Sequence, residues 1–263
     1  MSKDREEIKE SVKRKVRRRC GFGCVICGKP FYDYDHIEEY SKVQEHEASN
    51  LTLLCPDHHA EKTRGLRSSA QIRAADANPF NKRNGLSGPY VLAYEGSISK
   101  VSIGSNLFIQ SIGPNYGEPL VLNGEPMVKV RTEDGNLLVS AKLSDASGGI
   151  ILTIEENELR YDTNLWDVEF IAGRLVVRKA RGEIVSKIVF SPPDAITVER
   201  AYFSHEGITV RVTPREIMYE TRQGERTSFR DNEILDFPYP CGIVITDTSR
   251  TQDSLSAAFY FTV

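Results

Sequence analysis

The chain has 263 residues, of which 40% are hydrophobic and 27% are charged, and its formal net charge is −3. This length suits one large domain or two ordinary ones, and so small a net charge predicts no polyanionic partner by itself. No apolar run approaches the length of a membrane span, and the N-terminus "MSKDREEIKE" has no apolar signal core, so we expect a cytoplasmic protein without membrane contact.

The charge is unevenly distributed along the chain. Residues 1–85 carry 17 Lys and Arg against 13 Asp and Glu, whereas the rest of the chain has a net charge of −7. The basic excess accompanies a cluster of cysteines and histidines, and this combination favours an N-terminal part that faces nucleic acid.

The N-terminal part is predicted to combine short helices and strands. Ile8, Val12 and Val16 recur at every fourth position and predict a helix over residues 4–19. Its segment "KRKVRRR" (13–19) holds six cations in seven positions, which form either a solvated helix face or a set of phosphate contacts. The elements expected next are an aromatic strand at 31–40, a polar loop at 41–49, an apolar strand at 50–54, a helix that begins at Pro56, a helix at 68–77 with a serine cap, and a linker at 78–89.

From residue 90 onward the pattern is that of β-structure. Segments such as "MVKVRTEDGNLLVSAKL" alternate apolar and polar residues between Gly, Asn and Asp turns. This part is predicted to form either a β-roll or solenoid-like stack or a sandwich, with Trp166 in a core. Open strand edges and the apolar end "SAAFYFTV" favour a homo-oligomer formed through the β domain, and a sensor that gates the first domain is the alternative.

The cysteines indicate a metal site. Cys24 and Cys27 form one Cys-x2-Cys pair, and Cys55 and His58 form a Cys-x2-His pair some thirty residues later. Four such ligands complete a closed tetrahedral zinc site of the structural kind, which can hold together a domain with a small core. Cys20 and Cys241 are expected to be free thiols in or near a core.

With His58 assigned to zinc, Asp35, His36, Asn50 and His59 remain. In these residues the sequence resembles the HNH endonuclease family, whose core is a ββα-metal fold. The resemblance covers roughly residues 8–66. It rests on the basic helix before the first cysteine pair, on "DH" at 35–36, on "SNLTLLC" and on "CPDHHAEKT".

The resemblance implies a role for each of these residues. His36 is the expected general base, and Asp35 and His59 are expected to hold Mg²⁺ or another divalent ion. Asn50 would fix the loop after His36. Lys62, and more weakly Arg64, are candidates for phosphate contact.

Three other polar residues between His36 and Asn50 are expected to have no functional role. His46 is expected to be exposed to solvent, and Glu38 and Glu39 are read as a solvated strand end. A cysteine is the more usual fourth zinc ligand in the family, and His58 takes its place here.

The predicted class is therefore α+β. A small ββα-metal zinc domain spans 1–67, a helix and linker span 68–89, and a larger all-β domain spans 90–263. The function expected is metal-dependent hydrolysis of phosphodiester bonds in DNA, and by analogy with nucleases that need restraint it suits a restriction or phage-defence effector. The alternative is a non-catalytic zinc module that binds nucleic acid or a partner, with specificity supplied by the β domain.

Overall fold

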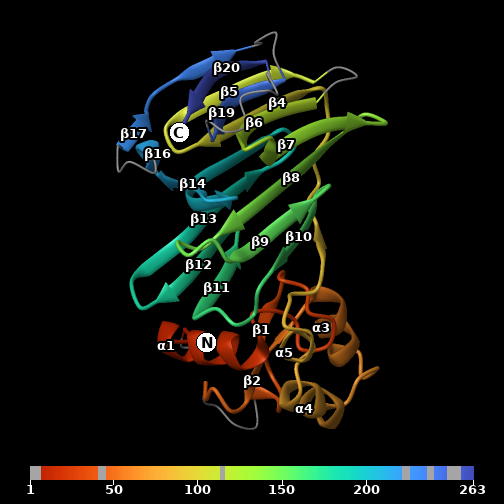
Figure 1. Ribbon diagram of the computed structural model, residues 1–263. Coiled ribbons are helices and arrows are strands. Elements are labelled where there is room, and N and C mark those ends of the chain that lie inside the picture. The colour runs from red at the N-terminus through yellow and green to blue at the C-terminus, as the bar shows by residue number, and fades with distance from the viewer. Residues whose placement is uncertain (1–6, 41–45, 113–115, 221–225, 236–239, 248–255) are drawn as a thin grey trace. The chain divides into compact units, whose positions relative to one another are not determined.

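The computed structural model describes residues 7–40, 46–112, 116–220, 226–235, 240–247 and 256–263 (Figure 1). The chain divides into two compact units. The first unit contains residues 1–90 together with residues 162–170, and the second contains residues 91–161 and 171–263. The segment 162–170 thus comes from within the strand-rich sequence but belongs to the N-terminal unit, and the sequence pattern gave no sign of this.

The predicted fold class is confirmed, because a small N-terminal ββα region precedes a large all-β part whose sheets are not closed. The first unit is made of α1 (Glu10–Cys20), β1 (Asp33–His36), β2 (Leu51–Leu54), α3 (Pro56–Thr63), α4 (Ser69–Ala77), α5 (Phe80–Asn84), the start of β3 (Tyr90–Val91) and most of β11 (Asp167–Ile171). Within the described residues no helix combines the length and the apolar character needed to cross a bilayer.

Helix α1 is shorter than the predicted helix. It begins at Glu10 because residues 7–9 are not helical, and the predicted start at residue 4 lies outside the described residues. It ends at Gly21, whose φ of 71° is the left-handed conformation that glycine adopts without a steric penalty. Val16 and Cys20 are fully buried against the strands, so one stripe of this basic helix is the apolar face of the unit.

Strands β1 and β2 form an antiparallel pair in which His36 lies opposite Leu51 and Asp33 opposite Leu54. All four residues of β2 are buried, which explains the continuous apolar run "LTLL". Strand β1 is more exposed and presents its polar side chains to a cavity. The buried strand therefore anchors the strand that carries the predicted catalytic residues.

Residues 78–89, which the sequence presents as a linker, are partly buried, with Pro79, Asn81, Ser87 and Gly88 in the interior. They include helix α5, whose Asn81 is fully buried. The Asn81 amide donates to the carbonyls of Gly21 (2.7 Å) and Gly28 (3.2 Å) and accepts from the backbone N–H of Gly88 (3.0 Å). One side chain thus ties three turns together, which is a structural task rather than that of a flexible connection.

The second unit consists of short antiparallel hairpins. Its strands are β4 (Ile98–Ile103), β5 (Asn106–Ser111), β6 (Tyr116–Leu122), β7 (Glu125–Glu133), β8 (Asn136–Ser144), β9 (Ile150–Glu155), β10 (Glu158–Tyr161), β12 (Arg174–Ala180), β13 (Glu183–Ser191), β14 (Ala195–His205), β15 (Ile208–Thr213), β16 (Glu216–Glu220), β17 (Arg226–Phe229), β18 (Glu233–Leu235), β19 (Cys241–Thr246) and β20 (Ala257–Thr262).

Two strand orders describe the pairing. One runs β20-β19-β6-β7-β8-β9-β10, and the other runs β12-β13-β14-β4-β5-β18. The second half of β14 leaves the latter set and pairs with β15, which continues through β16 to β17. Most strands adjacent in sequence pair antiparallel, as in meanders, whereas β19 pairs in parallel with both β20 and β6, and β14–β4 and β18–β5 are parallel as well.

The turn residues explain the hairpins. Several two-residue turns have positive φ at both positions, as type I′ turns require. They are Asn123-Gly124, Asp134-Gly135, Glu156-Asn157, Ala172-Gly173 and Glu206-Gly207. The Gly and Asn signals that predicted β-structure are therefore the residues that allow this backbone twist.

Candidate metal centre and catalytic pocket

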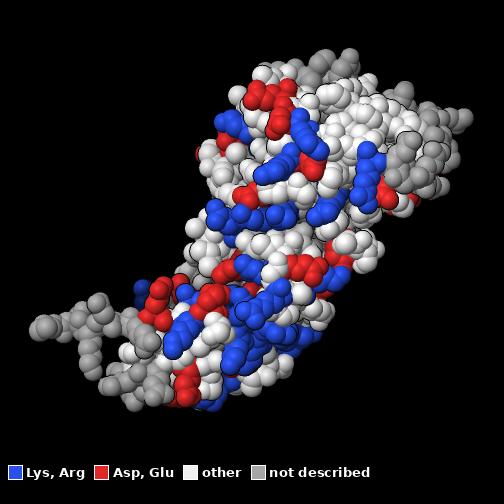
Figure 2. Space-filling model, turned by 90° about the vertical axis from the view of Figure 1, so that its left-hand side faces the viewer, with Lys and Arg blue, Asp and Glu red and all other residues white. Residues whose placement is uncertain are grey.

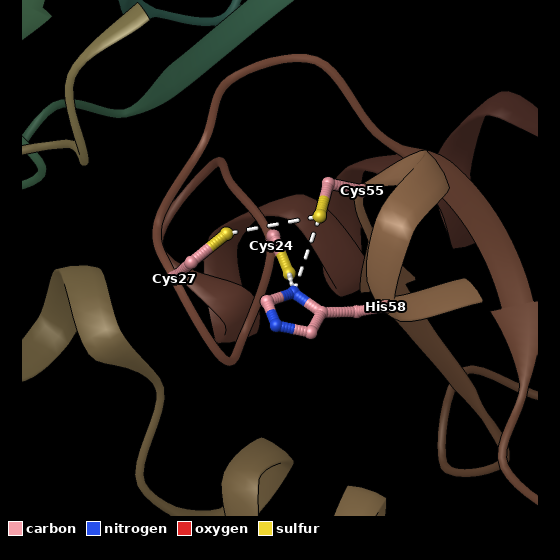
Figure 3. Close-up of side chains that lie close together, drawn as sticks. All are labelled: Cys24, Cys27, Cys55 and His58. Atoms are coloured by element: carbon pink, nitrogen blue, oxygen red, sulfur yellow. Dashed lines mark hydrogen bonds between the residues drawn. The ribbon is translucent and has the colours of Figure 1, made fainter. Parts of the chain in front are cut away.

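Cys24, Cys27, Cys55 and His58 converge on one point (Figure 3). The ligand atoms all lie within 4.8 Å of one another. The Nδ1 atom of His58 is 3.3 Å from the Cys24 sulfur and 3.2 Å from the Cys55 sulfur, and the sulfurs of Cys27 and Cys55 are 3.7 Å apart. The two sequence pairs thus form a single cluster.

Local structure brings each pair to the cluster. Cys24 and Cys27 stand on a turn in which the Gly28 N–H donates to the Cys24 carbonyl (2.8 Å), and a φ of 76° makes glycine suitable at position 28. Cys55 is the N-cap of α3, and Pro56 occupies its first position. His58 then lies one helical turn after Cys55, so both point to the same side.

These distances fit a metal ion. With bonds of about 2.3 Å to sulfur and 2.0–2.1 Å to nitrogen, tetrahedral zinc separates two sulfurs by about 3.8 Å and a sulfur from a nitrogen by about 3.5 Å. A hydrogen bond from the Cys27 thiol lowers the pKa of Cys24 to about 4, so one thiolate is favoured before any metal binds. The cluster can therefore hold a metal such as zinc.

A separate cavity of about 470 Å³ lies beside β1 and is lined by three of the other predicted residues. Asp35, His36 and His59 are among its lining residues. Nε2 of His59 is 3.5 Å from Oδ1 of Asp35, and the His59 side chain is 44% exposed. The structure therefore directs the adjacent histidines to different places: His58 joins the cysteines and His59 faces Asp35.

The Asp35 and His59 pair can contribute two ligands to a divalent ion. One carboxylate and one imidazole are few ligands, and such partial sets leave positions for water and for phosphate oxygens. Lys62 already contacts this carboxylate, because its Nζ donates to Oδ2 of Asp35 (2.5 Å) and to the carbonyl of His36. Lys62 thus links α3 to β1, which the assignment to phosphate contact did not foresee.

Asn50 braces the backbone just after His36. Its side-chain oxygen accepts from the N–H of Glu38 (2.9 Å), and its amide donates to the Glu38 carbonyl (3.1 Å). Its own carbonyl accepts from the N–H of Ile37 (2.7 Å). Both Asn50 and His36 are buried, so the loop is fixed at the point where the strand ends.

The expectation for His46 was wrong. This residue is half-buried, lines the same cavity, and places its Nδ1 3.1 Å from Nε2 of His36. Its ring stacks on that of Tyr40, with centroids 4.9 Å apart and planes at 21°. Its Nε2 is buried without a hydrogen-bond partner among the described residues. The polar sequence around His46 could not reveal this, because the contact depends on where residue 46 lies relative to His36 at the end of β1.

Three other expectations have mixed outcomes. Arg64 is exposed at the end of α3, where a phosphate contact remains a prediction. Glu38 pairs with Arg73 at 3.0 Å on the surface, in keeping with a solvated strand end. Trp166 is half-buried and belongs to the first unit, so it is not part of the β core.

Comparison with known protein families finds a match to part of the first unit. The family model of the HNH endonucleases matches residues 24–65, which contain the metal cluster, Asp35, His36, Asn50 and His59. The match falls within the range of the predicted resemblance, and the strand-rich part is unrecognised. No curated protein and no solved structure matches the chain. An HNH domain with a Cys/His metal site indicates a nuclease or nucleic-acid-binding function.

Proposed function

We propose that the protein is a metal-dependent endonuclease that hydrolyses phosphodiester bonds in DNA. The observation that carries the proposal is the placement of a buried, braced His36 beside the Asp35 and His59 pair at one cavity. Hydrolysis needs a base for the attacking water and a group that stabilises charge on the phosphoryl oxygens. A module that only binds nucleic acid needs no such combination.

In this proposal His36 takes the proton of the attacking water, a task that suits an imidazole near neutral pH. Asn50 holds the backbone after His36, and His46 restrains the ring through the bond to Nε2. Asp35 and His59 would hold the divalent ion, which when bound supplies Lewis-acid stabilisation of the phosphate and the leaving oxygen. Lys62 keeps Asp35 in place and has further N–H groups to offer.

Zinc is proposed as the ion of the Cys/His cluster. The cluster offers four soft or borderline ligands and no open position, which suits a structural site and not a catalytic one. It holds the turn before β1 against the start of α3, and so fixes the two elements that carry Asp35 and His59.

The test is cleavage of supercoiled plasmid DNA with Mg²⁺, Mn²⁺ or Ni²⁺ added in separate reactions. We expect His36→Ala and His59→Ala to abolish cleavage while the zinc content stays near one per chain. His205→Ala is the matched control, since His205 lies on β14 in the second unit, and it should cleave like the wild type. Cleavage by His36→Ala would contradict the mechanism. A wild type that binds DNA but never cuts it would favour the non-catalytic alternative.

A further inference from the structure

The cations of α1 have different structural roles. Arg17 is fully buried and donates to Asp167 (2.9 Å) and Glu10 (2.7 Å). Arg19 donates to the carbonyls of Ala48 and Leu51, and so also acts inside the unit. These two arginines hold the fold and are not available to a ligand.

The next face of the helix is different. Arg14 and Arg18, one turn apart, lie over the ring of Trp166, at 4.8 and 5.9 Å from its centroid. Trp166 comes from the segment 162–170, which is part of the same unit. Cation–π contact keeps two guanidinium groups side by side, and so reduces the entropy that they would lose on binding an anion.

Helix α5 extends this face. The Cγ atom of Lys82 lies 3.4 Å from where a Cβ on Gly21, at the end of α1, would stand. The Lys82 ammonium is 3.5 Å from the carbonyl of Thr163. Arg14, Arg18, Lys82 and Trp166 are here called the arginine-tryptophan face. Figure 2, which views the side on which Figure 1 shows α1, shows Lys and Arg gathered in a dense patch in the lower part of the molecule.

The acidic groups near this face do not cancel its charge. Asp167 is fully buried and is held by Arg17 and Arg14 (2.9 and 3.3 Å). Glu169 and Glu10 are directed at Arg17 (3.4 and 2.7 Å), and Glu10 also lies 4.0 Å from Arg14. Arg18 and Lys82 are exposed and form no ion pair with any described residue. The face therefore has an excess of positive charge and an aromatic base.

We infer that the arginine-tryptophan face binds the phosphodiester backbone of duplex DNA, as a second contact surface in addition to the catalytic cavity. Positions 14 and 18 are about 6 Å apart along the helix. A DNA strand carries a phosphate about every 3.4 Å of its axis, so the two guanidinium groups can engage phosphates of one strand. The inference rests on the proposed function in that the bound polymer is the substrate. It adds Trp166 and Lys82, which lie outside the residues 24–65 that match the family.

The test measures binding without cleavage. The full-length, zinc-loaded chain carrying His36→Ala is titrated with a fluorescein-labelled 30-base-pair duplex, and anisotropy is read at several KCl concentrations. Arg18→Ala with Lys82→Ala removes two exposed charges and leaves the buried Arg17–Asp167 pair in place. Arg181→Ala with Arg215→Ala is the matched control, because both arginines are exposed at turns of the second unit.

We expect the Arg18 and Lys82 variant to lose about 10-fold or more in affinity near 0.1 M salt, and the slope of log K against log salt to fall by about 2. The control should keep both values. Trp166 is the only tryptophan of the chain, so its intrinsic fluorescence should also change on addition of unlabelled DNA.

An unchanged slope in the Arg18 and Lys82 variant, or an equal loss in the control, would overturn the inference and point to an acidic protein as the partner of this face. The same holds if the parent chain does not bind the duplex. The proposed nuclease function fails separately: a wild type that binds with the expected slope but cuts no DNA refutes only that function, and one that cuts while the slope is unchanged refutes only this inference.

Discussion

Removing the carboxylate of Asp167 should destabilise the N-terminal unit more than any surface change. Arg17 and Asp167 are both fully buried, and two hydrogen bonds of 2.9 Å join them across 150 positions of sequence. Burial alone disfavours the charge on Arg17, but hydrogen bonds to Asp167 and Glu10 outweigh it and raise the pKa of Arg17. In Asp167→Ala the guanidinium stays charged and loses its main partner.

The loss of stability in Asp167→Ala depends on which partners Arg17 keeps. Breaking a buried ion pair by removing one partner costs about 3–5 kcal/mol. Arg17 keeps Glu10 at 2.7 Å and the Tyr34 hydroxyl at 2.8 Å, so we expect the lower end, about 3 kcal/mol. Asp167→Asn keeps the shape and one acceptor and should cost less. Arg17→Met combined with Asp167→Leu should recover much of the loss, because it removes both fully buried charges together.

Urea unfolding followed by Trp166 fluorescence provides the assay, because the only tryptophan lies in this unit. With a slope of about 1–3 kcal/mol per molar urea, a loss of 3 kcal/mol moves the midpoint by about 1–3 M. Glu183→Ala, at the exposed first residue of β13 in the second unit, is the control. A midpoint for Asp167→Ala equal to that of the control, or a double variant no better than Asp167→Ala, would refute the reasoning.

Three further outcomes are expected. Burial raises the pKa of Cys20 and Cys241 to about 12, so a thiol reagent at pH 8 should leave both unreacted in the folded chain. The reagent should label Cys24, Cys27 and Cys55 only after chelation of the metal, and all five cysteines in denaturant. Labelling of Cys20 in the folded chain would contradict its burial. His46→Ala should lower the cleavage rate about 10-fold at an unchanged KM for DNA. His46→Gln should recover part of the rate, because glutamine can still hydrogen-bond to His36. Equal rates in the wild type and both variants would show that His46 has no role at the site. Self-association through the second unit remains a prediction, which sedimentation of the full-length chain tests. The full-length chain is needed because a truncation at residue 88 would remove α1, the partner of Trp166 and Asp167. A monomer at tens of micromolar would reject the prediction.

The sequence by itself predicted the Cys/His cluster and the polar residues of the segment that matches the HNH model. Cys24, Cys27, Cys55 and His58 could be assigned because each pair is set by a local turn, and ligands two residues apart have few other arrangements. His36, Asn50 and His59 stand out as residue types in a fixed order, and the turn residues of the β hairpins act within two positions of one another.

The contacts between distant segments were decided only by the tertiary structure. The partner of Arg17 is 150 residues away, and nothing in "KRKVRRR" distinguishes the buried arginine from the exposed Arg18. His46 contacts His36 across ten positions of sequence, and Trp166 contacts α1 because residues 162–170 belong to the first unit. Local structure depends on neighbouring residues, so the sequence could predict it. Burial and ion pairing depend on which distant surfaces meet, so the sequence could not predict them.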